Sequence, residues 1–229
     1  MAARKPSPPK AAMQKRILIV DDHPMMREGL RGVINREPDM MVCGEAENAQ
    51  QAMNAVQKLA PDLALVDITL PGKSGLELVK DLKAMYPHVV ILAISMHDES
   101  LYAERALRAG AKGYVMKHSA AKNIVAALRR IRGGEIYVSE ELRSRLVARA
   151  IDGKPGKKSS GLGQLSDREL EVFRLIGQGL KKSELALRLK LSVNTIESHR
   201  ASLKRKLNVN SSSELARLAI LHVEGEHDH

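Results

Sequence analysis

The sequence contains no tryptophan, one phenylalanine and one cysteine among its 229 residues. With Cys43 alone, the chain forms no internal disulfide and offers no cluster of thiolates to a metal, which fits a reducing cytoplasm. No apolar run approaches the roughly 20 residues that a membrane-spanning helix needs, so we expect a soluble protein without a membrane partner. Hydrophobic residues still make up 44% of the chain, and its cores must therefore be largely aliphatic.

The net charge of +10 is unevenly distributed along the chain. Residues 1–16 carry five Lys or Arg and no acid, so about half of the surplus lies there. Residues 1–14 also contain Pro6, Pro8 and Pro9 and lack the apolar core of a signal peptide, which predicts a disordered basic arm. Global basicity is therefore weak support for nucleic-acid binding, and local clustering of charge must carry that claim.

Four apolar runs in the first half each end on a polar residue. The runs and their ends are Arg16–Val20 before Asp21 and Asp22, Asp62–Val66 before Asp67, Val89–Ile94 before Ser95, and Gly113–Met116 before Lys117. Unbroken aliphatic runs predict strands that are buried on both faces, as in a parallel sheet. Because the carboxyl ends of such strands share one edge, we expect these polar residues to meet in one crevice.

Between these runs lie stretches with apolar residues at three- and four-residue spacing, which predicts helices. Met40–Cys43 supplies a fifth short strand. Alternation of strand and helix five times over residues 15–132 predicts an α/β domain with a doubly wound, five-stranded parallel sheet of the flavodoxin-like type.

The predicted crevice has the composition of a phosphoryl-transfer site. Asp21, Asp22 and Asp67 repel one another unless a cation lies between them, and Mg²⁺ prefers oxygen ligands of this kind. Asp67 would attack a phosphoryl group as a nucleophile, while Lys117 and Ser95 would contact its oxygens. The tight loop after Asp67 could turn the carbonyl of Thr69 toward the metal.

These residues resemble the receiver domain of response regulators. The resemblance rests on Asp21-Asp22-His23-Pro24, on Asp67 with Leu70-Pro71-Gly72, on Ser95-Met96-His97, and on Gly110–Lys117. It implies that Asp67 is the phosphoacceptor, that Asp22 and Asp67 bind Mg²⁺ directly and that Asp21 acts through a water. It also implies that Ser95 and Tyr114 form a switch pair, in which Ser95 moves toward the phosphate and the Tyr114 ring turns inward. Taken alone, Ser95 and Tyr114 are also compatible with simple packing roles, and His23 with a structural one.

The second half begins with residues 133–164, which we interpret as a linker containing a helix at about 139–150 and a flexible stretch at Asp152–Gly161. Residues 165–222 predict a small all-α domain of four helices, followed by a tail at 223–229. Ser166 and Glu169 form a capping box before the first of these helices, and Ser192 caps the third. A short helix, a turn at Lys190 and a basic helix from about Val193 to Leu207 predict a helix-turn-helix.

This segment resembles the LuxR-type helix-turn-helix of the NarL/FixJ response regulators, notably in Thr195–Arg200 and Lys206-Leu207. Helical spacing places Asn194, Glu197, Ser198, Ala201 and Arg205 on the stripe opposite the buried face. We expect the DNA-binding residues to be Asn194, Thr195, Glu197, Ser198, His199, Arg200, Ala201, Lys204 and Arg205, and we expect Arg200, Lys204 and Lys206 to suit phosphate contact. The amphipathic segment Glu214–Ile220 either pairs two copies on DNA or packs on its own domain.

The sequence as a whole predicts a cytoplasmic, phosphorylation-dependent transcriptional regulator and not an enzyme. A sensor histidine kinase would be the phosphodonor, and double-stranded DNA the target of a homodimer, with RNA polymerase as a further contact. By the resemblance, the unphosphorylated receiver would hide the DNA-binding helix. A phosphatase is the enzymatic alternative, but Thr69 stands where several such enzymes place a second acid. A regulator that uses its receiver only as a dimerisation scaffold is the other alternative.

Overall fold

The computed structural model describes residues 14–96, 99–151 and 161–225. The predicted basic arm, nearly all of the Asp152–Gly161 stretch and the last four residues of the tail lie outside these ranges. Among the described residues, no helix combines the length and the apolar character needed to cross a bilayer.

The first half forms a five-stranded parallel sheet in the order β2-β1-β3-β4-β5. The strands are β1 (Lys15–Val20), β2 (Met40–Ala46), β3 (Leu63–Asp67), β4 (Val90–Ser95) and β5 (Gly113–Met116). The helices that connect or follow them are α1 (Pro24–Ile34), α2 (Ala49–Leu59), α3 (Gly75–Met85), α4 (Glu99–Ala109) and α5 (Lys117–Arg132). This arrangement confirms the predicted doubly wound α/β fold, although β2 is longer than the predicted Met40–Cys43 and α5 begins directly at Lys117.

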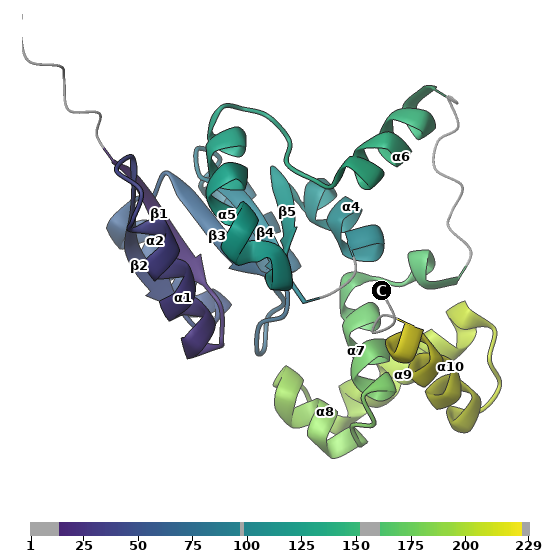
Figure 1. The fold of residues 1–229 in the computed structure, drawn as a ribbon. Helices are drawn as coiled ribbons and strands as arrows, with labels where there is room; N and C mark the ends of the chain where they lie inside the picture. Colours follow the sequence, from purple (N-terminus) through teal and green to yellow (C-terminus); the bar gives the residue numbers. More distant parts are fainter. Residues whose placement is uncertain (1–13, 97–98, 152–160, 226–229) are drawn as a thin grey trace, which may run out of the picture.

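Alternate residues of the central strands feed two aliphatic cores, as the pleat of a strand requires. Leu18, Ala64 and Ala93 face the layer of α2, α3 and α4, whereas Ile19, Leu65 and Ile94 face α1 and α5. The ribbon shows these two helical layers on opposite sides of the sheet (Figure 1). All five strands run in the same direction, so their carboxyl ends lie along one edge.

The remaining described chain is helical. It comprises α6 (Glu140–Ile151), the 3₁₀ turn η1 (Gly161–Gln164), α7 (Asp167–Gly177), α8 (Lys182–Leu189), α9 (Val193–Leu207) and α10 (Ser212–Gly225). Ser139 caps α6 by accepting a hydrogen bond from the backbone N–H of Leu142 at 3.1 Å. Helices α7 to α10 pack together as a unit on the α4 side of the sheet (Figure 1), which confirms the predicted helical second domain.

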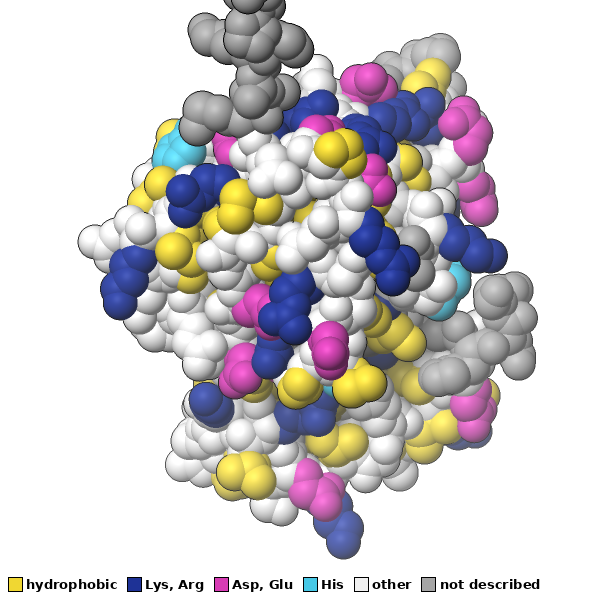
Figure 2. Space-filling model, turned by 60° about the vertical axis from the view of Figure 1, so that its left-hand side comes forward, with side chains coloured by type: hydrophobic (Ala, Val, Ile, Leu, Met, Phe, Trp, Pro, Cys, Tyr) yellow, Lys and Arg dark blue, Asp and Glu magenta, His cyan; other side chains and the backbone are white. Residues whose placement is uncertain are grey.

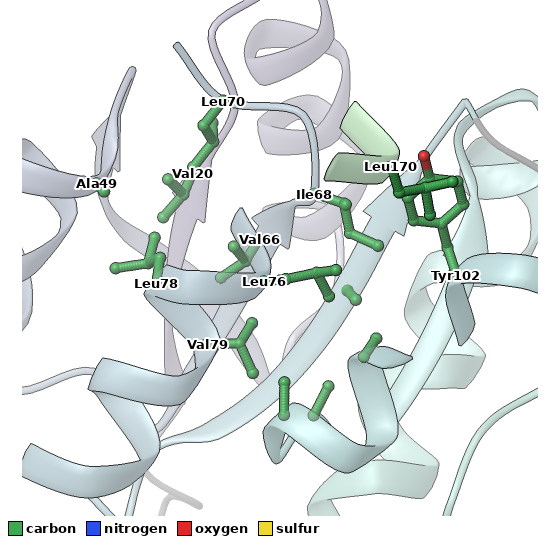
Figure 3. Close-up of a cluster of buried hydrophobic side chains, with 14 of the residues drawn as sticks. Val20, Ala49, Val66, Ile68, Leu70, Leu76, Leu78, Val79, Tyr102 and Leu170 are labelled. Atoms are coloured by element: carbon green, nitrogen blue, oxygen red, sulfur yellow. The ribbon is translucent and has the colours of Figure 1, made fainter. Parts of the chain in front are cut away.

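The apolar core of the α2–α4 layer continues into the helical unit. Leu170 of α7 is buried beside Tyr102 of α4, and Ile68 lies nearby in the loop after β3 (Figure 3). The two domains therefore share buried apolar surface in this structure. The face shown in Figure 2 carries Lys and Arg side chains interspersed with Asp and Glu side chains. Elsewhere in the described chain, ion pairs include Arg129–Asp39 at 2.8 Å.

Candidate phosphoacceptor and DNA-binding sites

The carboxyl edge of the sheet brings together the acids that the sequence singled out. Asp21 follows β1 and Asp67 ends the neighbouring strand β3, while Lys117 follows β5. The Lys117 Nζ atom lies 2.7 Å from Asp21 Oδ2 and 2.7 Å from Asp67 Oδ2. All three side chains are at least 97% buried, so one cation bridges two carboxylates out of contact with bulk water.

The loop after β3 holds the Asp67 carboxylate in place. The backbone N–H of Thr69 donates a hydrogen bond to Asp67 Oδ1 at 3.0 Å. The N–H of Gly75 at the start of α3 donates to the Ile68 carbonyl at 2.8 Å. A Cβ atom at residue 75 would collide with the Asp67 carbonyl oxygen, so this close return of the loop requires glycine. The same loop is therefore tightly coupled to the position of Asp67.

Burial raises the pKa of Asp67 to about 7, and the nearby charge of Asp21 adds to this rise, whereas Lys117 opposes it. Burial also acts to lower the pKa of Lys117, but the charges of Asp67 and Asp21 outweigh it and raise that pKa. The pocket thus stabilises the charged ammonium while it leaves a surplus of negative charge. A further cation would relieve that surplus.

Four potential ligand atoms, one each from Asp21, Asp22, His23 and Asp67, lie within 4.8 Å of one another. The Asp22 Oδ1 atom is buried and accepts no hydrogen bond from the described residues. A buried carboxylate oxygen without a donor is costly unless an ion or water satisfies it. The donor set is mainly carboxylate oxygen, so the residues present fit a divalent cation.

The proposed switch residues are both internal. Ser95, the last residue of β4, is fully buried, and Tyr114 of β5 is only 1% exposed. The Tyr114 ring packs in the core of the α2–α4 layer, so the ring already points inward in this structure. Their role as a switch pair stays a prediction.

Arg27 was not predicted from the sequence, although it contacts the backbone of Asp21 in the acidic pocket. Its guanidinium donates to the Asp21 carbonyl at 2.7 Å, to Glu45 at 3.1 Å and to Glu47 at 3.0 Å. It is buried on α1, where an unpaired arginine would be very unfavourable. In the sequence, the only sign of this role is that Arg27 is a single charged residue within the apolar stripe of a predicted helix.

The helix-turn-helix presents its predicted reading stripe to solvent. Ser192 caps α9, because its side chain accepts a hydrogen bond from the Thr195 N–H at 3.0 Å. Lys190 adopts the left-handed conformation with φ 52° at the turn before it. Ile196 and Leu203 are buried beneath α9. The predicted DNA-binding residues divide into an exposed group, Asn194, Ser198, Ala201 and Arg205, and a partly exposed group, Thr195, Glu197, His199, Arg200 and Lys204.

Lys206 also has a partner inside the protein. It donates to Glu169 Oε2 at 2.6 Å and so ties α9 to α7, and its contact with a DNA phosphate stays a prediction. Ser202 donates to the other oxygen of Glu169, also at 2.6 Å. Glu197 forms an ion pair with Lys182 of α8, and Ser198 donates to the Asn194 carbonyl of its own helix at 3.1 Å.

A polar cluster joins the two domains around the start of α7. Arg105 of α4 donates to the Leu165 carbonyl at 2.8 Å, to the Leu162 carbonyl at 3.0 Å and to Asp167 at 3.0 Å. Lys80 of α3 donates to the other oxygen of Asp167 at 2.7 Å. A small cavity beside this cluster is lined by residues of both domains, among them Thr69, Ser74, Tyr102, Glu171 and Arg174.

The receiver contacts α7 and the loop before it, and Pro71 and Gly72 of the receiver line a cavity together with Lys190 of the turn before α9. Asn194, Ser198 and Arg205 of α9 are exposed to solvent while the domains are in contact. That the receiver keeps this helix from DNA stays a prediction.

Comparison with known proteins identifies both domains. Residues 17–129 match the response regulator receiver domain, and residues 163–219 match the bacterial regulatory proteins of the luxR family. The nitrate/nitrite response regulator protein NarL of Escherichia coli (strain K12) is 34% identical over 202 residues, which cover 87% of this chain and 92% of NarL. The response regulator UvrY of the same strain is 32% identical over 206 residues, covering 90% and 94% of the two chains.

Solved structures match this chain over most of its length. RcsB from Salmonella enterica serovar Typhimurium, bound to promoter rprA in the presence of the phosphomimetic BeF3-, is 28% identical with a TM-score of 0.63. The match covers 89% of this chain and 97% of that RcsB chain. These relatives are DNA-binding regulators and not enzymes. The chain belongs to the NarL/FixJ family of two-component response regulators, whose receiver domain controls a LuxR-type DNA-binding domain.

Proposed function

We propose that Asp67 is the phosphoacceptor of this regulator and that Mg²⁺ is the cation that supports the transfer. The observation that carries this assignment is the buried Asp67 carboxylate, held between Lys117 and the Thr69 N–H beside Asp21 and Asp22. Asp21, Asp22, Asp67 and the carbonyl of Thr69 would hold the ion. When bound, the ion neutralises phosphate oxygens and so allows an anionic carboxylate to approach them.

The donor is inferred to be the phosphohistidine of a sensor histidine kinase. An Asp67 carboxylate oxygen forms the new bond to phosphorus as the phosphorus–nitrogen bond of the donor breaks, and the histidine keeps the bonding electron pair. Lys117 then exchanges its contact with the carboxylate for one with a phosphoryl oxygen, and the Ser95 hydroxyl donates to another. The result is an aspartyl phosphate with a charge that the unmodified pocket lacks.

The second half of the function is DNA binding through α9. We infer that Asn194, Glu197, Ser198, Ala201 and Arg205 face the bases, and that Thr195, His199, Arg200 and Lys204 lie near the backbone. RcsB has been solved both in a complex with DNA and as two dimers bound to two parallel DNAs, which supports a homodimer on DNA for this chain. The cytoplasmic location expected from the sequence is compatible with a DNA target and with a contact to RNA polymerase.

The contact between domains supplies a route from Asp67 to the DNA-binding unit. Ile68 and Thr69 follow the phosphoacceptor directly, and both line the cavity shared with Asp167, Glu171 and Arg174 of α7. A phosphoryl group on Asp67 would shift this loop and weaken the contact with α7. The DNA-binding unit would then be free to pair with a second copy.

The decisive experiment is selection of DNA from a random pool by the full chain, with and without beryllofluoride and Mg²⁺. Enrichment of a paired half-site sequence only with the phosphate mimic is the expected result. Equal enrichment in both arms would favour a regulator that uses the receiver as a dimerisation scaffold. An Asp67→Ala chain, run in parallel, should show no response to the mimic, because beryllofluoride bonds to that carboxylate.

A further inference from the structure

His23 lies at the rim of the acidic pocket, directly after Asp21 and Asp22. It occupies the N-cap position of α1, but its side chain makes no capping hydrogen bond to that helix. Instead its ring turns toward the pocket, where Nδ1 lies 2.7 Å from Asp22 Oδ1 and 3.1 Å from Asp21 Oδ1. His23 thus occupies a capping position, but no capping hydrogen bond orients its imidazole ring.

The contact with Asp22 does not count as a hydrogen bond, despite its short distance. Asp22 Oδ1 is buried and accepts no hydrogen bond from the described residues. Two atoms with lone pairs at such a separation match neighbouring ligands of one ion, because metal–ligand distances of about 2.1 Å at right angles put adjacent ligand atoms roughly 3 Å apart. The 3.1 Å contact with Asp21 Oδ1 is a hydrogen bond when Nδ1 carries the proton, and it fits the same ligand spacing in the other tautomer.

The rest of the ring is suited to this arrangement. The His23 side chain is 61% exposed, so water can accept a hydrogen bond from a proton on Nε2. In that tautomer the lone pair of Nδ1 points at the carboxylates, as in protein metal sites that use a histidine.

We propose that His23 Nδ1 is a further ligand of the cation in this pocket and that it shifts the preference of the pocket from Mg²⁺ toward Mn²⁺ and similar ions. Mg²⁺ favours oxygen ligands, whereas imidazole nitrogen favours first-row transition metals. A site with three carboxylates and one imidazole still admits Mg²⁺, but it gains affinity for Mn²⁺ from the nitrogen. This inference rests on the proposed metal site and names one more of its ligands.

The test measures Mn²⁺ and Mg²⁺ binding to the full chain, using the electron paramagnetic resonance of Mn²⁺ and its displacement by Mg²⁺. Three variants are compared with the unmodified protein: His23→Ala, Asp22→Ala and His118→Ala. His118 is the matched control, because it is an exposed histidine next to Lys117 at the same edge of the sheet. All variants keep the histidines near the C-terminus, so the difference at His23 isolates this one ligand.

His23→Ala should weaken Mn²⁺ binding by about tenfold and leave Mg²⁺ affinity nearly unchanged. The pulsed spectrum of bound Mn²⁺ should show coupling to an imidazole nitrogen that disappears in His23→Ala and persists in His118→Ala. If His23→Ala changes neither the coupling nor the ratio of the two affinities, His23 is only a hydrogen-bonding neighbour of Asp21, and the inference is wrong. If Asp22→Ala also binds Mn²⁺ normally, the proposed metal site itself fails.

Discussion

At the scale of single residues, the proposed phosphoacceptor role of Asp67 predicts that its carboxylate cannot be exchanged for an amide. Asp67→Asn keeps the size of the side chain but removes the nucleophile, so we expect no labelling of the full chain by acetyl phosphate in the presence of Mg²⁺. Asp62→Asn is the control, because Asp62 stands just before the same strand and pairs with Lys15 at the opposite edge of the sheet. If the Asp67→Asn variant is still labelled, the assignment of Asp67 as the nucleophile is wrong.

The α9 helix carries a second prediction at this scale. Lys204→Ala should weaken binding to all DNA sequences and reduce the slope of its salt dependence by about one, because one phosphate contact is lost. Ser198→Ala, on the exposed stripe, should instead change the order of preferred sequences in the selection experiment. A uniform loss of affinity in Ser198→Ala would show that this side chain does not contribute to base reading.

At the scale of elements, the capping box of α7 also fastens the recognition helix. Burial alone would raise the pKa of Glu169, but hydrogen bonds from Lys206, Ser202 and Ser166 lower it to about 2. The folded-state pKa is thus below the ordinary value of 4.5. The ionised carboxylate therefore stabilises the fold above about pH 4.5, and this stabilisation is lost as the pH falls toward 2.

Glu169→Gln should accordingly lower the free energy of unfolding of the full chain by about 1–2 kcal/mol at pH 7. Urea unfolding followed by circular dichroism at several pH values measures the difference from the unmodified protein. That difference should shrink as the pH is lowered from 4.5 toward 2, provided the chain remains folded there. Glu184→Gln serves as control, since Glu184 forms the equivalent contact of α8 at an exposed position. A difference independent of pH would contradict the role of the ionised carboxylate.

At the scale of the whole molecule, Arg105 is the central residue of the contact between the domains. Its three hydrogen bonds reach η1, Leu165 and Asp167, and its side chain is 13% exposed. Arg105→Ala should raise the fraction of chains with separated domains, which increases the radius of gyration in solution scattering. Unphosphorylated Arg105→Ala should also bind selected DNA about tenfold more tightly, since the cost of opening falls by roughly 1.4 kcal/mol.

Arg108→Ala is the matched control for this experiment. Arg108 lies on the same helix, and its ion pair among the described residues is with Glu104 of that helix, at 2.5 Å. We therefore expect the same scattering profile and the same DNA affinity as in the unmodified chain. If Arg105→Ala behaves like Arg108→Ala, the interface does not control DNA binding.

How much of this structure could be predicted from the sequence depends on how far apart along the chain the interacting residues lie. Period and run length located the strands, and the direction of parallel strands then brought Asp21, Asp67 and Lys117 together. Arg27 and Arg105 were missed because most of their partners, such as Glu45 and Asp167, lie 18 or more residues away in the sequence. The contact of Lys206 with Glu169 was not predicted, because helical spacing does not tell which flank of α9 packs on α7.

The loop from Ile68 to Gly75 has two roles, because it holds Asp67 in place and also lines the contact with α7. Coupling through such a shared element is reciprocal, because each ligand changes the affinity for the other by the same factor. Promoter DNA that binds the released domain should therefore tighten the binding of beryllofluoride to the pocket. The promoter would then act as an effector of its own regulator, since a chain bound to DNA would hold the phosphate mimic more tightly than a free chain.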